Sequence, residues 1–70
     1  MISYKKLWIR LAERGLSKGD LREQSGISTN ILAKLGRDEP VSLDSLEKIC
    51  NFLDCNIGDI MDFIRTEEEK

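Results

Sequence analysis

The sequence predicts an all-α fold, a compact domain of five helices with no sheet, on two observations. Apolar residues recur along most of the 70-residue chain at three- and four-residue spacings, as in helices with one buried face. Four of the five segments follow a serine or asparagine placed to cap the free N–H groups of the first helical turn. A chain of this length forms one domain with a thin core, which dimerisation would help to stabilise.

The first helix is expected over residues 3–14. Its apolar face carries four residues at helical spacing: Tyr4, Leu7, Trp8 and Leu11. We expect Trp8 to be the central core residue, because nucleic-acid stacking platforms usually contain several aromatic side chains. Gly15 should end the helix and let Leu16 fold back on Leu11.

Two short helices joined by a tight turn are expected over residues 17–35. Ser17 and Asp20 have the spacing of a capping box, and Ser28 is placed to cap the second helix. Between them, Gly26 can take the left-handed conformation that turns the chain sharply. Helices joined in this way cross steeply, as in the helix-turn-helix arrangement whose second helix enters the DNA major groove. The angle between them should be filled by Leu21, Ile27, Leu32 and Leu35.

The outer face of the second of these helices carries short polar groups and one cation: Ser28, Thr29, Asn30 and Lys34. An asparagine can bond adenine through N6 and N7, and a lysine can donate to guanine O6 and N7. Ile31 faces either the core, which we favour, or the groove, where it would touch a thymine methyl group. The polar residues are therefore the candidate base contacts.

Residues 36–41 are predicted to form a loop, because Pro40 forces Glu39 toward an extended conformation. A fourth helix should begin after Ser42, with Asp44 in its first turn. Its inward residues are expected to be Leu43, Leu46, Ile49, Cys50 and Leu53.

A fifth helix should begin after Asn56, which has Asp59 three residues later. Its inward residues are expected to be Ile57, Ile60, Met61 and Ile64. Phe52 and Phe63 lie off the apolar faces, so each either fills a gap in the core or contributes to a partner surface. The domain is expected to span residues 1–64, and residues 65–70 form a charged tail.

The charges are distributed unevenly along the chain, although the net charge is only −2. Residues 1–37 hold eight Lys and Arg against three Asp and Glu, and residues 38–70 hold three against ten. The basic half would then approach phosphates while the acidic half faces away. The alternative, that both halves are ordinary solvated surface, is equally consistent with the charges alone.

Several functional classes lack the residues they require. Cys50 and Cys55 are five positions apart and the chain has no histidine, so neither a zinc site nor a Cys-x-x-Cys pair can form, and two buried thiols are expected. Without a nucleophile or paired carboxylates, no enzyme, metal, cofactor or small-molecule substrate is predicted. No apolar run could span a membrane and no signal peptide is evident, so a cytoplasmic location is expected.

Three segments of the chain resemble the lambda-repressor-like (XRE-type) helix-turn-helix family. They are the segment from Leu16 to Leu35, the following Gly36-Arg-Asp-Glu-Pro-Val-Ser-Leu, and the stretch from Leu46 to Met61. The likeness to its small stand-alone regulators covers nearly the whole chain. It implies a sequence-specific regulator of transcription, a repressor that occupies a promoter operator in double-stranded DNA. Lys18 and Arg37 would contact phosphates, and the polar outer face would contact bases. Arg22 departs from the family, in which many members have alanine.

Two further expectations follow from this assignment. A helix-turn-helix scaffold also serves protein-interaction modules such as antitoxins or anti-repressors, although a polar and basic outer face favours DNA. One recognition helix offers too few contacts for operator affinity, so we expect a homodimer on a near-palindrome with half-sites about 34 Å apart. The dimer contact is expected on the acidic half, where the fifth helix and Phe63 lie away from the DNA, with Phe52 as a further candidate.

Overall fold

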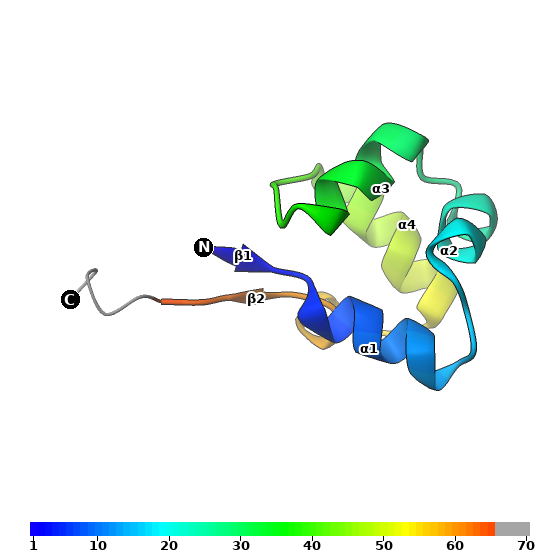
Figure 1. Ribbon diagram of the computed structural model, residues 1–70, viewed down its shortest axis with the longest axis horizontal. Coiled ribbons are helices and arrows are strands. Elements are labelled where there is room, and N and C mark those ends of the chain that lie inside the picture. The colour runs from blue at the N-terminus through cyan, green and yellow to red at the C-terminus, as the bar shows by residue number, and fades with distance from the viewer. Residues whose placement is uncertain (66–70) are drawn as a thin grey trace.

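Four α-helices and a two-stranded sheet make up the computed structural model, which describes residues 1–65 (Figure 1). Their order is β1 (Ile2–Ser3), α1 (Lys5–Glu13), α2 (Lys18–Ser25), α3 (Thr29–Gly36), α4 (Leu43–Leu53), the 3₁₀ turn η1 (Ile57–Asp59) and β2 (Asp62–Phe63). Helix α2 packs against both α3 and α4. The predicted helical fold is confirmed for the helix-turn-helix and for α4, whereas the expectation of five helices and no sheet is wrong.

The hydrophobic core lies between the helices and draws on every one of them. Its buried members are Tyr4, Leu7, Leu11, Leu21, Ile27, Leu35, Leu46, Ile49, Leu53 and Ile60. The central aromatic residue is Tyr4, which is fully buried, and not Trp8, which is only partly buried. Leu32 and Ile31 also pack against the core from partly exposed positions.

The predicted caps and turns form as the sequence indicates. The Asp20 N–H donates to Ser17 Oγ at 3.0 Å and the Ser17 N–H donates to Asp20 Oδ2 at 2.9 Å, which completes the capping box. Gly26 has a φ of 86°, in the left-handed region that favours glycine. After Gly15, the Leu16 N–H donates to the Leu11 carbonyl at 2.9 Å, the closure expected at the end of α1.

The C-terminal segment differs most from the prediction. The Asn56 N–H donates to Asp59 Oδ2 at 3.0 Å, as in a capping box, but only one 3₁₀ turn follows. The chain then extends into β2, which pairs antiparallel with β1 in the register Ile2 with Phe63 and Ser3 with Asp62. The spacing of the apolar residues in 57–64 is typical of a helix, but the backbone hydrogen bonds of β2 are made with β1, a strand from the other end of the chain. Ile57 and Ile64, expected to face inward, are exposed.

Three smaller expectations are also corrected. Helix α1 begins at Lys5, because residues 2–3 belong to the sheet. Leu43 is 77% exposed, and the inward position in that turn is taken by Ser45, whose hydroxyl is hydrogen-bonded with that of Ser42. The two cysteines are partly rather than fully buried. The predicted tail, residues 65–70, lies outside the described residues except for Arg65.

Within the described part of the chain, no helix combines the length and apolar character needed to cross a membrane.

Candidate nucleic-acid interface

Helix α3 is held in place by its apolar side and by its cap. Leu35 is fully buried, and Ile27, in the turn before the helix, is 5% exposed. The Ile31 N–H donates to Ser28 Oγ at 3.1 Å, so Ser28 caps the helix. This bond uses one of the two acceptor lone pairs of the Ser28 hydroxyl, so the second lone pair and the hydroxyl hydrogen are left for the predicted base contact.

The outer side of α3 is an exposed and mostly neutral stripe. Thr29 and Asn30 are exposed as predicted, while Lys34 is partly buried at one edge. Asn30, Ala33 and Arg37 follow at helical spacing, so they share one face. Sequence reasoning missed Ala33, although its place three residues after Asn30 could have identified it. Ile31 is partly buried against the core, the orientation that we favoured.

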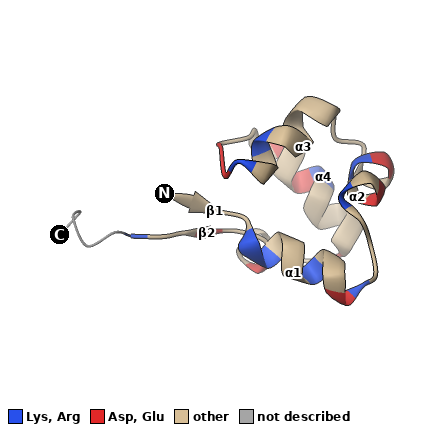
Figure 2. Cartoon of the chain, viewed as in Figure 1, with Lys and Arg blue, Asp and Glu red and all other residues tan. Residues whose placement is uncertain are grey.

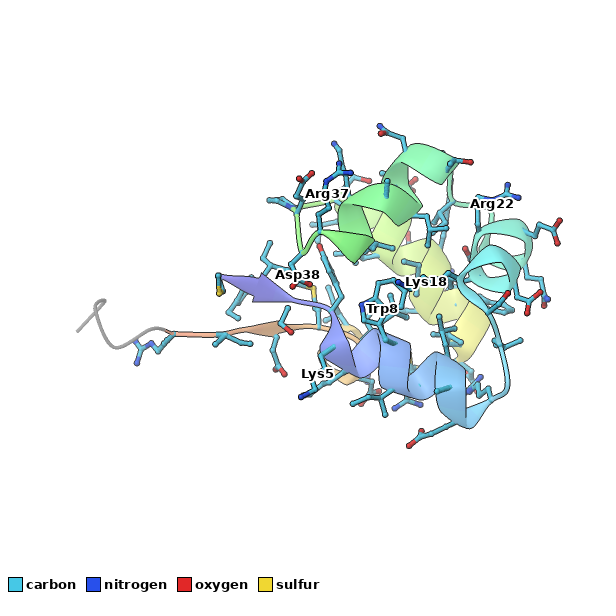
Figure 3. The ribbon with its side chains drawn as sticks, in the orientation of Figure 1. Lys5, Trp8, Lys18, Arg22, Arg37 and Asp38 are labelled. Carbon is cyan, nitrogen blue, oxygen red and sulfur yellow. The ribbon has the colours of Figure 1, made fainter. Side chains whose placement is uncertain are left out.

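Lys18 stands in the first turn of α2, where the resemblance places a phosphate contact. Its ammonium lies 4.4 Å from the centre of the Trp8 ring, a cation–π contact between α2 and α1 (Figure 3). Such contacts contribute about 0.5 to 1 kcal/mol at exposed sites. Lys18 therefore already has an intramolecular partner before any DNA is bound.

Arg37, just beyond α3, is paired with Glu39. Its Nε and Nη2 atoms donate to the two carboxylate oxygens of Glu39 at 2.8 and 3.2 Å. These hydrogen bonds lower the pKa of Glu39, against the opposing effect of desolvation and with a further contribution from the charges of Arg37 and Lys34. The same bonds raise the pKa of Arg37. Arg37 is exposed at the predicted position, but a phosphate would have to compete with this carboxylate.

The loop that carries this ion pair is anchored to the start of α1. The Tyr4 hydroxyl donates to the Glu39 carbonyl at 2.8 Å, and the Tyr4 N–H donates to Asp38 Oδ1 at 3.1 Å. Asp38 adopts a φ of 57°, which turns the loop at this point. Burial, and then the charge of Asp38, raise the pKa of Tyr4. The end of the recognition helix is thus fixed to α1 through a buried tyrosine.

Arg22 sends its head group outward from α2 while its stem is partly covered (Figure 3). This is one of the two ways in which an arginine fits where many members of the family have alanine.

The basic half of the chain does not form one uninterrupted positive surface. Figure 2 shows Lys and Arg on α1, α2 and the end of α3, interspersed with Asp and Glu. Lys6 lies 3.3 Å from Asp62, and Arg10 lies 3.9 Å from Asp59. The acidic C-terminal segment therefore folds back on α1 and compensates part of its charge, so the expected separation into a basic and an acidic face is wrong for α1.

Among residues 1–65, no group of three or more His, Cys, Asp or Glu is placed to hold a metal ion.

A glycine turn between α2 and α3, a capped α3 and an exposed polar outer face define a helix-turn-helix DNA-binding protein. The sequence matches the Cro/C1-type HTH DNA-binding domain over residues 6–66, and the chain belongs to that family. The resemblance to lambda-repressor-like regulators is confirmed.

Two known proteins resemble the chain over most of its length. YozG of Bacillus subtilis (strain 168), named as an uncharacterized HTH-type transcriptional regulator, is 36% identical over 63 residues, which are 87% of this chain and 74% of YozG. The crystal structure of the transcriptional regulator VanUg (Form II) superposes with a TM-score of 0.89 at 46% identity, covering 93% of this chain and 87% of that one. The chain is a DNA-binding transcriptional regulator and not an enzyme.

Proposed function

We propose that this regulator represses transcription by occupying an operator within a promoter. The observation that supports this best is the stripe on α3, where Thr29, Asn30 and Ala33 are exposed on a helix held by its cap and by Leu35. Exposed amide, hydroxyl and methyl groups on one rigid face suit the edges of bases in a major groove. Lys34 extends this face, while Lys18 and Arg37 contact phosphates on either side.

The proposal is tested by selecting a preferred duplex from random oligonucleotides and placing it in a promoter. In transcription with purified components, the regulator should lower the amount of transcript from that promoter. A promoter with the same site scrambled should be unaffected. A rise in transcript would contradict repression, and failure to enrich any sequence would favour a protein-interaction module on the same scaffold.

Lys34→Ala tests the recognition face directly. It should cost roughly 1 to 3 kcal/mol on the selected duplex and relax the preference at one or two base pairs. Lys48→Ala removes a lysine from the exposed side of α4 and is the matched control, which should bind as the unaltered protein does. Equal losses for both variants would show that α3 is not the recognition element.

The regulator acts as a homodimer in this proposal, and an apolar surface beside the sheet supplies the contact. Phe63 and Leu43 are each 77% exposed, and with Ile2, Val41, Ile57 and Met61 they line one apolar groove. Asp62, the charged residue of this groove, is already paired with Lys6. Two copies can therefore meet here about a two-fold axis without like charges opposing each other. We call this the sheet surface.

Sedimentation with the selected duplex tests the dimer. Two protein chains should bind each duplex, and the selected sequence should be a near-palindrome with half-sites about 34 Å apart. One chain per duplex at saturation on an asymmetric site would refute the dimer.

Because promoter DNA lies in the cytoplasm of a bacterial cell, the expected cytoplasmic location remains part of this proposal.

A further inference from the structure

The end of α4 brings the two cysteines of the chain together. Helix α4 stops at Leu53, and Asp54 adopts the left-handed conformation with φ of 55°. The N–H groups of both Asp54 and Cys55 then donate to the carbonyl of Cys50, the second of them at 3.1 Å. A backbone turn of this kind sets the first and last of its six residues side by side, and their side chains commonly touch.

The side chains in those two positions are usually apolar, but here both are thiols. Each is partly buried, packed against the core on one side and accessible on the other. Burial, then the charge of Cys55 and a hydrogen bond with it, and then the charge of Asp59 raise the pKa of Cys50. The 3.1 Å hydrogen bond from the Cys55 N–H to the Cys50 carbonyl holds the two residues next to each other in the folded protein.

We propose that Cys50 and Cys55 form a reversible dithiol site, which closes to an intrachain disulfide on reaction with a low-molecular-weight disulfide. A disulfide needs Cα atoms only about 4.4 to 6.8 Å apart, and a turn closed by a hydrogen bond between these same two residues meets that need.

The chemistry is two thiol–disulfide exchanges. We assign the first attack to Cys55, because burial raises the pKa of Cys50 and so disfavours the thiolate there. The Cys55 thiolate attacks the small disulfide RSSR, forming a mixed disulfide and releasing one RS⁻. Cys50 then loses its proton and attacks the Cys55 sulfur, which forms the intrachain bond and releases the second RS⁻. The two protons lost by the protein convert both leaving groups to RSH, so the protein dithiol is oxidised as the small disulfide is reduced.

The bridge would join the end of α4 to the segment leading into η1 and β2. Leu53, between the two cysteines, is fully buried in the core. Through η1 and β2 the same segment reaches Ile57 and Phe63 of the sheet surface. A disulfide here would therefore constrain the segment that leads to the sheet surface, and not α3. This inference is independent of the proposed repression.

The test uses oxidised glutathione and the full chain, with intact mass and alkylation of free thiols as readouts. The folded protein should lose 2 Da per chain with no retained glutathione, remain monomeric on a denaturing gel, and regain both thiols with dithiothreitol. Because folding holds the sulfurs together, closure of the mixed disulfide should be at least about tenfold faster than in urea, as expected for groups held in position.

Two variants complete the test. Cys50→Ser should stop at a stable mixed disulfide on Cys55, with helicity retained by circular dichroism. Cys55→Ser should react more slowly than Cys50→Ser, because burial disfavours the thiolate of the remaining Cys50. A mixed disulfide that persists in the unaltered folded protein, closure no faster than in urea, or a disulfide between chains would overturn the proposal.

Discussion

The first half of α3 and the two cations beside it, which are the proposed DNA contacts, differ in the intramolecular partners that they already have. Thr29 and Asn30 are exposed on a capped helix, with water as the partner that a base edge would replace. Lys18 lies over Trp8, and Arg37 is held in two hydrogen bonds by Glu39. Thr29 and Asn30 therefore differ from the two cations: Lys18 already contacts an aromatic ring, and Arg37 already contacts a carboxylate.

In the proposed complex, this difference would separate sequence specificity from general affinity for DNA. A base contact from α3 replaces water, so a matched base adds its full contribution and a mismatched base leaves a polar group unpaired. A phosphate contact from Lys18 or Arg37 replaces an existing contact, so its net gain on any DNA is small. In the proposed mode of binding, non-specific affinity is therefore low and sequence preference arises from α3.

Preventing dimerisation, and so taking the second recognition helix off the operator, should produce the largest loss of operator affinity. Phe63→Asp places a charge on the sheet surface, where each copy would bring the same charge to the two-fold axis. Linked binding of two modules exceeds single binding by about 10²-fold or more, so operator affinity should fall by that order. Ile9→Asp alters an exposed apolar residue on α1, outside the groove, and is the control. Unchanged affinity and stoichiometry for Phe63→Asp would place the dimer contact elsewhere.

Tyr4→Phe should have the next largest effect, which is a loss of folding stability. It removes the hydroxyl bonded to the Glu39 carbonyl, which should lower the free energy of unfolding by roughly 0.5 to 1.5 kcal/mol. The pKa of Tyr4 is higher in the folded protein than in the unfolded chain, so this contribution is fully present below about pH 10 and is lost as the pH rises through the folded value.

Urea denaturation of both proteins at pH 7 and at alkaline pH would measure this. The stability gap between Tyr4→Phe and the unaltered protein should narrow as the pH rises. A gap that stays constant or widens would contradict the role assigned to the hydroxyl.

Glu39→Gln should have a smaller effect, which is an increase in affinity for DNA. It removes the charge that competes for Arg37, so binding to DNA of any sequence should strengthen. The slope of log K against log salt should steepen by about one phosphate contact. Glu47→Gln, an exposed carboxylate on α4, controls for the change in net charge. If both variants gain equally, net charge and not the Arg37 pair limits the affinity.

Much of this interface could be predicted from local sequence signals. The Ser17 and Asp20 box, Gly26 and the Ser28 cap act within four residues, so the two helices and their turn follow from sequence alone. The sheet could not be predicted, because Ile2 pairs with Phe63 from the opposite end of the chain. The partners of the two cations were also missed, each for a different reason. Lys18 meets Trp8 through tertiary packing, and Arg37 reaches Glu39 because Asp38 turns the loop.

The most direct test of the division between base and phosphate contacts is one titration series. Asn30→Ala, Lys18→Ala and the control Asn51→Ala would be titrated on selected and scrambled duplexes over a range of salt concentrations. Asn30→Ala should lose roughly 1 to 3 kcal/mol on the selected duplex and little on the scrambled one, with an unchanged salt slope. Lys18→Ala should weaken both duplexes alike and reduce the slope by about one unit, and Asn51→Ala should change neither. Equal losses on both duplexes for Asn30→Ala, or a loss confined to the selected duplex for Lys18→Ala, would contradict the assignment of specificity to α3.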